Sequence, residues 1–279
     1  MRLKYFKPSP PFQDWLTAHA IVDSVPTPMF ERFPAMLPNL HIRLGGSTTY
    51  FFEDGAVVEA PQVALLGPTL SSYRVLLGPG LHLVATGFLP DGCTRLIGVP
   101  ARELSDRIVD ATAIWGQRAI DRLLDQLIGQ HDETAIGAIV ERFLVQQARE
   151  PASSSSTADA VDYWLEHSPS LDLAELQALL GVGDRHMRRL VMESHGAAPK
   201  ALAMKYRALR AAASIAFHGT PALSRAMAPY ADQAHFIRDF RRFTGWAPGA
   251  FVAQNRNAAA STLAGRRQAG IVRPLSLWS

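Results

Sequence analysis

Two segments of the chain place arginine side chains at helical spacing, and their chemistry is the most specific in the sequence. Within residues 222–251 a helical pattern stops at Pro229 and a second one follows. The second pattern puts Phe236, Phe240 and Phe243 on one face and arginines on the others. A short helix, a turn and an arginine-bearing helix make a helix-turn-helix, whose second helix enters a DNA major groove. This segment therefore predicts contact with duplex DNA.

The same pattern occurs a second time, upstream. Moving back by about 49 residues places His235 on His186, and the run GWAPGAF from Gly245 on GAAPKAL from Gly196. A period of this length is typical of an internal structural repeat. Apolar, glycine and proline positions recur while several exposed positions differ, as expected of two equal scaffolds that read different bases.

These residues resemble the DNA-binding domain of the AraC/XylS transcription regulators. The resemblance rests on DRHMRRLV and GAAPKAL in the first copy and on DQAHFIRDFRRFTGWAP in the second, and it covers roughly residues 160 to 256. In that family a long linker helix joins two helix-turn-helix units. More weakly, LPNLHIRLGG and VATGFLPDGC…LIGVPARELSDRIVD resemble an uncharacterised sensor-like N-terminal domain of one branch of these regulators. The resemblance implies a transcription regulator that is not an enzyme and uses no cofactor, with activation and repression both left open.

The resemblance and the helical spacing together select the side chains that read DNA. Arginine suits guanine and glutamine suits adenine, each good bidentate pair giving about 1–3 kcal/mol of discrimination, and small apolar side chains suit a thymine methyl. For any one arginine, contact with phosphate or with an acidic neighbour is the alternative. His235 is expected to be structural, because it matches a histidine in the repeat. The predicted DNA-contacting residues are Arg185, Arg188, Arg189, Gln233, Ala234, Ile237, Arg238 and Arg242.

Three residues depart from the family pattern. Gly183 stands where a Ser or Thr N-cap is usual, Val191 replaces an aromatic residue, and Pro229 replaces a glycine. Because proline cannot adopt the positive φ that glycine adopts after a helix, the second turn must be built differently.

A linker helix is expected to open at Pro199 and to hold the two recognition helices about 34 Å apart, on one face of the DNA. Lys205, Arg207 and Arg210 on this helix are expected to face phosphates or solvent.

The first hundred residues favour β-structure, because prolines leave no room for a long helix except at Phe12 to Val22. Short strands with turn signals indicate a barrel or a sandwich, and two apolar stripes at helical spacing follow. We expect the first stripe to cover the β core. The second stripe either covers this core or forms a dimer interface, as the family resemblance suggests. The strand candidates are His41–Leu44, Thr48–Phe52, Val63–Leu66, Tyr73–Leu77 and Leu81–Phe88, and the stripes run from Ile120 to Ile128 and from Ile136 to Leu144.

The predicted fold class is α+β: a barrel-like β domain with a helical pair, then an all-α domain with two helix-turn-helix units. Charge divides the same way, with 13 Lys+Arg against 17 Asp+Glu in residues 1–160 and 15 against 8 in residues 161–279. A basic C-terminal half suits a polyanion. The expected divisions are a sensor or dimerisation domain at 1–150, a Ser-rich linker at 151–158, the DNA-binding domain at 159–257, and a flexible tail at 258–279 in which Arg266 and Arg267 add weak attraction to DNA.

Other classes of protein find less support. The single cysteine, Cys93, the lack of a signal peptide and the lack of a long apolar run favour a cytoplasmic location without membrane contact. No phosphate-binding loop or nucleophile elbow is present, and neither His41 nor His82 has the neighbouring histidine usual in cupin metal sites. The alternative hypotheses are a cupin-like metal-binding or enzymatic N-terminal domain with accessory DNA binding, and a DNA binder without an effector. The expected partner is double-stranded DNA, with RNA polymerase, a small-molecule effector and a second copy of the chain left open.

Overall fold

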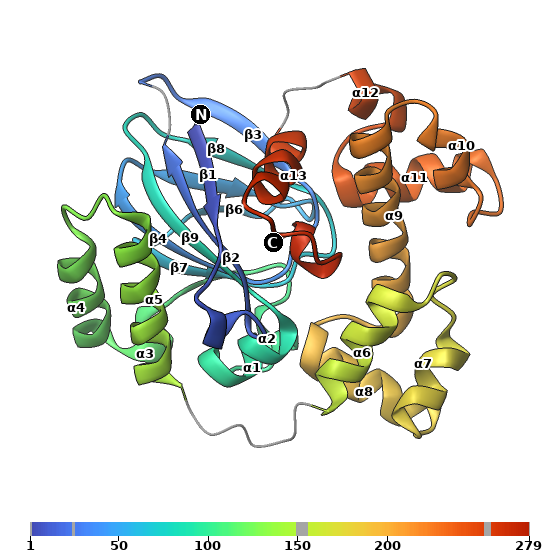
Figure 1. The fold of residues 1–279 in the computed structure, drawn as a ribbon, viewed down its shortest axis with the longest axis horizontal. Helices are drawn as coiled ribbons and strands as arrows, with labels where there is room; N and C mark the ends of the chain where they lie inside the picture. Colours follow the sequence, from blue (N-terminus) through green and yellow to red (C-terminus); the bar gives the residue numbers. More distant parts are fainter. Residues whose placement is uncertain (1, 24–25, 149–155, 254–257, 279) are drawn as a thin grey trace.

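The computed structural model describes residues 2–23, 26–148, 156–253 and 258–278. Of the linker expected at 151–158, residues 151–155 lie outside the described residues. Residues 156–158 belong to a helix. Two antiparallel sheets and helices on one side form the N-terminal part, and a set of helices forms the rest, so the fold class is α+β as predicted (Figure 1).

The two sheets face each other. One has the strand order β1-β2-β9-β4-β7-β10 and the other has the order β3-β8-β5-β6. Every strand pair is antiparallel, and together the sheets bury a core that includes Tyr50, Tyr73 and Leu83. The strands are β1 (Arg2–Phe6), β2 (Leu16–Asp23), β3 (Met29–Phe33), β4 (Asn39–Gly45), β5 (Thr48–Phe51), β6 (Val57–Glu59), β7 (Val63–Leu66), β8 (Tyr73–Leu77), β9 (His82–Phe88) and β10 (Ile108–Asp110).

All five predicted strands are present, but the helix predicted at Phe12 to Val22 is wrong. A short 3-10 turn, η1 (Pro10–Phe12), precedes β2, which pairs with β1 on one side and β9 on the other. The run LTAHAI is buried or half-buried throughout, so it shows no alternation. A continuously buried strand cannot be told from a buried helix by periodicity alone.

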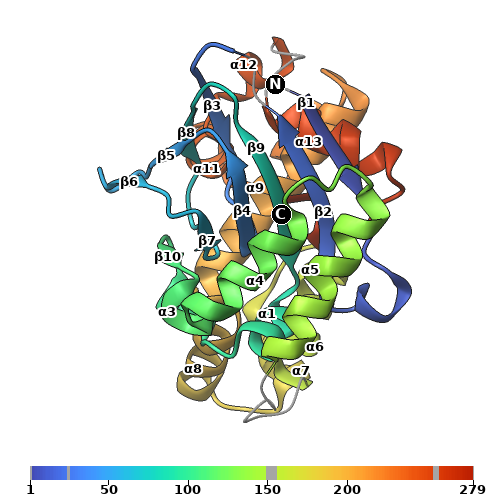
Figure 2. The same cartoon turned by 90° about the vertical axis from the view of Figure 1, so that its left-hand side faces the viewer.

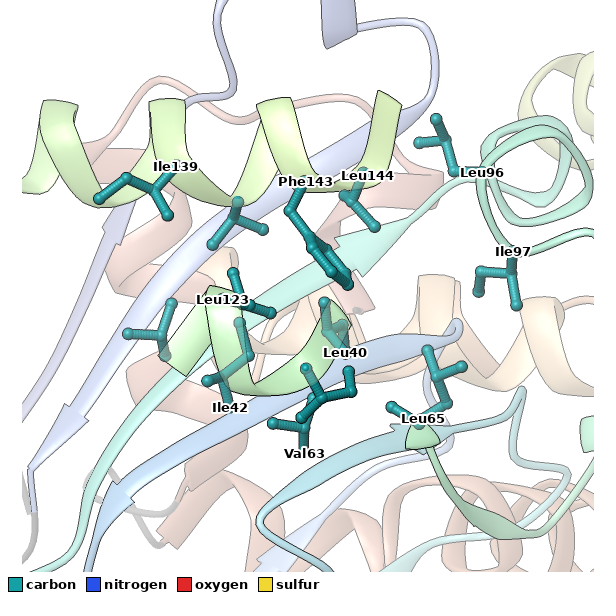
Figure 3. Packing of buried hydrophobic residues seen from close by; sticks show 14 of the residues in the cluster. Leu40, Ile42, Val63, Leu65, Leu96, Ile97, Leu123, Ile139, Phe143 and Leu144 are labelled. Carbon is teal, nitrogen blue, oxygen red and sulfur yellow. The ribbon is translucent and has the colours of Figure 1, made fainter. Parts of the chain in front are cut away.

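Two helices cover the outer face of the larger sheet, which is the arrangement favoured for the first stripe and one of the two alternatives left open for the second. They are α4 (Gln117–Leu127) and α5 (Glu133–Gln147), and they lie in front of that sheet in Figure 2. In Figure 3, Leu123, Ile139 and Phe143 point from them toward Ile42 and Val63 of the sheet. Both apolar stripes are therefore used inside the chain, except that Ile128, just past the end of α4, is 70% exposed.

Three shorter helices complete this part: α1 (Pro90–Ile97), α2 (Ala101–Leu104) and α3 (Thr112–Trp115). Leu96 and Ile97 of α1 join the core under the helical pair (Figure 3). The sequence PDG is typical of a turn, but here it forms the beginning of α1. A proline is tolerated in the first turn of a helix.

The C-terminal part contains the expected helices: α6 (Ser156–His167), α7 (Leu173–Leu180), α8 (Asp184–His195), α9 (Pro199–His218), α10 (Ala222–Met227), α11 (Gln233–Thr244) and α12 (Pro248–Ala253). The expectation of a flexible tail is wrong for the described residues 258–278. They form α13 (Ala258–Gln268) and a final 3-10 turn, η2 (Leu275–Trp278), in which Leu275 and Trp278 are buried. Arg266 is also buried, so it cannot contact DNA, whereas the exposed Arg267 lies over the ring of Phe217.

A buried polar network joins α5 to the larger sheet. The His19 ring lies 2.8 Å from Thr86 Oγ1 and 3.2 Å from Glu141 Oε1, and Ser9 donates two hydrogen bonds of 2.7 Å to the Glu141 carboxylate. Burial alone would raise the pKa of Glu141, but the hydrogen bonds from His19 and Ser9 hold it below its usual value. The ionised carboxylate therefore stabilises the packing of α5 on the sheet.

We predict that Glu141→Gln destabilises the protein by about 1–3 kcal/mol, because an amide cannot accept every hydrogen bond that the carboxylate accepts. A carboxylate whose pKa is lowered by folding contributes stability that is lost as the pH falls through that pKa. The loss of stability in acid should therefore be smaller in the variant than in the original chain. Urea unfolding at neutral and acidic pH measures both effects, and equal stability of the two chains at neutral pH would contradict the prediction.

Candidate nucleic-acid interface

The first helix-turn-helix unit consists of α7, a turn at 181–183, and α8. Gly181 ends α7 with φ 63°, the left-handed conformation that glycine adopts most readily. Met187 and Val191 turn inward and join Trp164 and Leu202 in one buried cluster. Val191, which replaces an aromatic residue, is fully buried there. The unit thus has its own core, and α8 presents its other faces outward.

The N-terminus of α8 lacks a side-chain cap. Gly183 has the extended conformation of an N-cap, with φ −72° and ψ 161°, and it makes no side-chain hydrogen bond. A Cβ at this position would meet nothing within 4 Å. The departure from the family pattern is therefore a missing hydrogen bond, without strain in the backbone.

The second unit, α10, residues 228–232 and α11, has a longer turn without a left-handed residue. Ala228 continues in right-handed helical geometry, with φ −52°, and the Tyr230 amide donates to Met227 O at 2.9 Å. Asp232 then caps α11 by accepting from the His235 amide at 2.7 Å. The second turn is thus built differently from the first, as the proline predicted. The cap at Asp232 defines where α11 begins.

The predicted DNA-contacting side chains are exposed on these two recognition helices. Arg185 and Arg188 project from α8, and Gln233, Ala234, Ile237 and Arg238 project from the first half of α11. Arg189 is also exposed, but its guanidinium lies 3.1 Å from the Glu193 carboxylate and 2.8 Å from the His186 ring. Arg242 lies over the ring of Phe243, at 5.1 Å. Arg189 is therefore engaged within the protein, which matches the alternative of an acidic neighbour, whereas Arg242 is exposed.

The linker helix α9 separates the two recognition helices. It is 20 residues long, which at 1.5 Å per residue is roughly 30 Å. In Figure 1, α8 lies near one end of α9 and α11 packs beside the other. This length is close to the roughly 34 Å between successive major grooves on one face of DNA.

Three cationic side chains of α9 were expected to face phosphates or solvent, but each of them donates a hydrogen bond to a backbone carbonyl of the protein. Arg210 donates to Ser168 O at 2.7 Å, and Arg207 donates to Ser170 O at 3.2 Å. Lys205 is buried against the N-terminal part and donates to Met36 O at 2.8 Å. Burial lowers the pKa of Lys205 to about 7. Sequence reasoning missed this contact because the apolar pattern of α9 places Lys205 beside the buried face without showing what covers it.

The N-terminal part contacts the C-terminal end of each recognition helix. Ser105 Oγ donates to Gly196 O, just past α8, at 2.7 Å. The amides of Ala35 and Ser72 donate to Phe243 O and Arg242 O in the last turn of α11, at 2.7 Å and 2.9 Å. The last carbonyls of a helix have no partner inside it. The N-terminal part supplies hydrogen-bond donors to such carbonyls at the ends of both helices. No sequence motif signals them.

The alternative of a metal-binding N-terminal half finds no support among the described residues, where no three His, Cys, Asp or Glu side chains gather. His41 lies 2.7 Å from the Tyr50 hydroxyl, and His82 lies 2.7 Å from the Asp23 carboxylate.

We predict that Gly183→Ser raises the free energy of unfolding by a few tenths of a kcal/mol, because a serine hydroxyl can cap α8 where there is open space. Gly183→Ala, which fills the same open space without a hydroxyl, should give no such gain. Thermal unfolding measures the difference, and a decrease in the serine variant would show that this helix start is not limited by its cap.

Comparison with known proteins agrees with this geometry. Residues 176–254 match the family described as "Helix-turn-helix domain". The search of curated proteins finds no match. An apo lysine-to-alanine variant of ToxT from Vibrio cholerae has a similar fold, with a TM-score of 0.50 and 11% identity over 84% of this chain and 96% of that one.

Two other solved structures are more distant. ToxT from Vibrio cholerae with a bound unsaturated fatty acid gives a TM-score of 0.47 and 12% identity over 90% of this chain and 97% of that one. The AraC-like transcriptional activator CuxR gives 0.29 and 16% identity over 69% of this chain and 76% of that one. Among the described residues, no helix is both long and apolar enough to cross a membrane.

The family match covers both helix-turn-helix units, from Leu176 in α7 to the end of α12. Residues 176–254 of this chain are thus a helix-turn-helix domain of the AraC/XylS type.

Proposed function

We propose that this chain is an AraC-type transcription regulator that places α8 and α11 in two successive major grooves on one face of its DNA site, and that the N-terminal part controls this binding. The observation that supports the proposal most directly is the pair of similarly built units at the two ends of the 20-residue helix α9. A helix of this length matches one turn of DNA, so neither unit needs to move far to reach its groove.

The first turns of each recognition helix supply the base contacts. Arg185 and Arg188 on α8, and Gln233 and Arg238 on α11, lie in the N-terminal halves of their helices and are exposed. In helix-turn-helix proteins it is this end of the recognition helix that reaches base edges. Arg189 can read a base only after exchanging Glu193 for it, so it contributes less than its position suggests.

Control by the N-terminal part follows from the contacts at the other ends of the helices. Ser105, Ala35 and Ser72 donate to carbonyls at the ends of α8 and α11, and Arg102 lies 2.9 Å from Glu193 on α8. Any effector that prefers one arrangement of the N-terminal part changes how these donors are placed, and so shifts the population of DNA-binding conformations.

We predict that Arg188→Ala and Arg238→Ala each weaken binding to the cognate site by about 1–3 kcal/mol, and that together they abolish preference over unrelated DNA. Arg118→Ala, an exposed arginine on α4, is the matched control and should change nothing. A mobility-shift assay on a site selected from genomic DNA, repeated at several salt concentrations, measures affinity and specificity together. Undiminished preference in the double variant would refute this assignment of the recognition helices.

We predict that the burial of Lys205 makes stability depend on pH. The unfolded lysine has a pKa near 10.5 and the folded one about 7, so the unfolded state binds more protons between these values. The contribution of this group to stability therefore rises with pH, by up to about 1.4 kcal/mol per pH unit.

The matched pair for this prediction is Lys205→Met and Lys200→Met, since Lys200 is exposed on the same helix. From pH 7 to pH 9, the original chain should gain stability relative to Lys205→Met but not relative to Lys200→Met. Urea unfolding across this range measures the gain, and parallel curves for all three chains would show that Lys205 does not change its protonation on folding.

A further inference from the structure

A chain of polar contacts runs along α8, from the N-terminal part to the first turn of that helix. Arg102 of α2 donates to Glu193 Oε1 at 2.9 Å, where α2 packs against α8 near its C-terminal end (Figure 1). One turn earlier on the same face, Arg189 donates to both oxygens of this carboxylate, at 3.2 Å and 3.1 Å. Another nitrogen of the Arg189 guanidinium lies 2.8 Å from Nε2 of His186, which must accept because a guanidinium can only donate.

Glu193 is the member of this chain that two cations share. Its carboxylate carries one negative charge, and the guanidinium groups of Arg102 and Arg189 both donate to the same atom, Oε1. Contact with one arginine therefore weakens the attraction that remains for the other. The side chains of Arg102, Glu193 and Arg189 are 44%, 36% and 57% exposed, so these contacts can exchange without unfolding the structure around them.

The second helix-turn-helix unit lacks this arrangement at the equivalent positions. The shift of about 49 residues that relates the two copies places Arg238 on Arg189, but it places Arg242 on Glu193. In the part of the chain that the structure describes, the exposed Arg238 forms no ion pair. The same scaffold thus holds the arginine in the first unit and leaves its equivalent exposed in the second, and the acidic residue that makes the difference stands at one position.

We propose that Glu193 is a positioning residue that keeps Arg189 from reading DNA, and that the N-terminal part weakens this restraint through Arg102. The proposal rests on the proposed function, and it names how the N-terminal part acts on one of the two units. While Arg102 binds the carboxylate, Arg189 is held less strongly and can turn to a guanine in the major groove. When α2 moves away from α8, the whole charge of Glu193 acts on Arg189 and keeps it on the surface of the helix.

A small movement of α2 is enough to change this balance. A hydrogen bond of 2.9 Å is lost beyond about 3.5 Å, so a shift of α2 by roughly 1 Å separates Arg102 from Glu193. The first half-site is then read by Arg185 and Arg188 without Arg189. Reading by the second unit does not involve this carboxylate, so the control changes the preference at one base pair of the site and leaves the other half-site as it was.

The test is a double-mutant cycle in the full chain, with a duplex that the original chain selects from genomic DNA. Competition mobility-shift assays measure the preference of each chain for this duplex over a duplex of unrelated sequence. Glu193→Gln should raise the preference about two- to fivefold, the range for release of an exposed ion pair, and should have no effect in a chain that also carries Arg189→Ala. Arg102→Ala should lower the preference by a similar factor, and should have no effect in a chain that also carries Glu193→Gln.

Glu175→Gln is the matched control, because Glu175 is an exposed carboxylate of the same unit, on α7. Loss of a negative charge near DNA strengthens binding to every duplex alike, so this variant should bind both duplexes more tightly with an unchanged preference.

A set of duplexes in which each base pair of the first half-site is replaced in turn separates base reading from a structural effect. Arg189→Ala should remove discrimination at the base pair that Arg189 reads. Glu193→Gln should increase discrimination at that base pair and at no other, whereas a general change in the stability of α8 would alter all positions together.

The inference is overturned if Glu193→Gln and Glu175→Gln change the preference equally, if the effect of Glu193→Gln persists without Arg189, or if Arg102→Ala acts equally with and without Glu193. Arg238→Ala in the same assay tests the proposed function separately, because Arg238 belongs to the other unit. A loss of preference in Arg238→Ala without coupling between Glu193 and Arg189 would overturn this inference alone. An unchanged preference in Arg238→Ala would contradict the proposed function itself.

Discussion

The arrangement of this protein depends on the need of helix ends for hydrogen-bond partners. The last carbonyls of α8 and α11 have no partner within their helices, and Ser105, Ala35 and Ser72 of the N-terminal part supply the donors. Because one body supplies both ends, the two recognition helices are placed relative to the same sheets as well as to α9. A linker helix alone would fix their separation but leave each unit free to tilt.

The centre of this interface is filled by residues from five separate parts of the sequence. Lys205 of α9 donates to Met36 O, the Met36 amide in turn donates to Thr69 Oγ1 at 2.8 Å, and the Leu70 amide donates to the Asp106 carboxylate at 2.8 Å. Trp278, at the other end of the chain, accepts from the Leu37 amide. A buried ammonium group is costly unless it is bonded, so this lysine ties the position of α9 to that of the loop that carries Met36.

How much of this could be predicted from the sequence depends on whether the determining contacts are local. The apolar spacing that indicates a recognition helix in each copy is local, and the structure has α8 and α11 at these places. Strand β2 was missed because both of its faces are buried: His19 meets Glu141 of α5, and Ala18 and Ala20 face the space between the sheets, which removes the alternation that marks a half-buried strand. The tail was missed for the same kind of reason, because α13 packs on Tyr5, which lies at the other end of the chain and donates to Thr262 Oγ1.

The candidate site divides in the same way. Helical spacing places Arg188 and Arg238 on exposed faces without knowledge of the rest of the fold, and the structure has them there. The same spacing gives no indication that Arg189 forms an ion pair with Glu193, or that Lys205 is buried against the N-terminal part. Whether a cation on a helix meets solvent or protein is decided by what packs against that helix, and a repeat pattern carries no such information.

The contacts that hold the recognition helices and the side chains proposed to read DNA lie at opposite ends of those helices. The donors from the N-terminal part bind at Gly196 and at Arg242 and Phe243, whereas Arg185 and Gln233 project from the first turns. The N-terminal part therefore does not need to leave for DNA to bind, and it does not block the surface that DNA would use. On the proposed function, it changes the angle at which each helix is presented to DNA. Two grooves on one face of a duplex accept only a narrow range of such angles, so a small shift of the shared body would favour or prevent binding of both units at once.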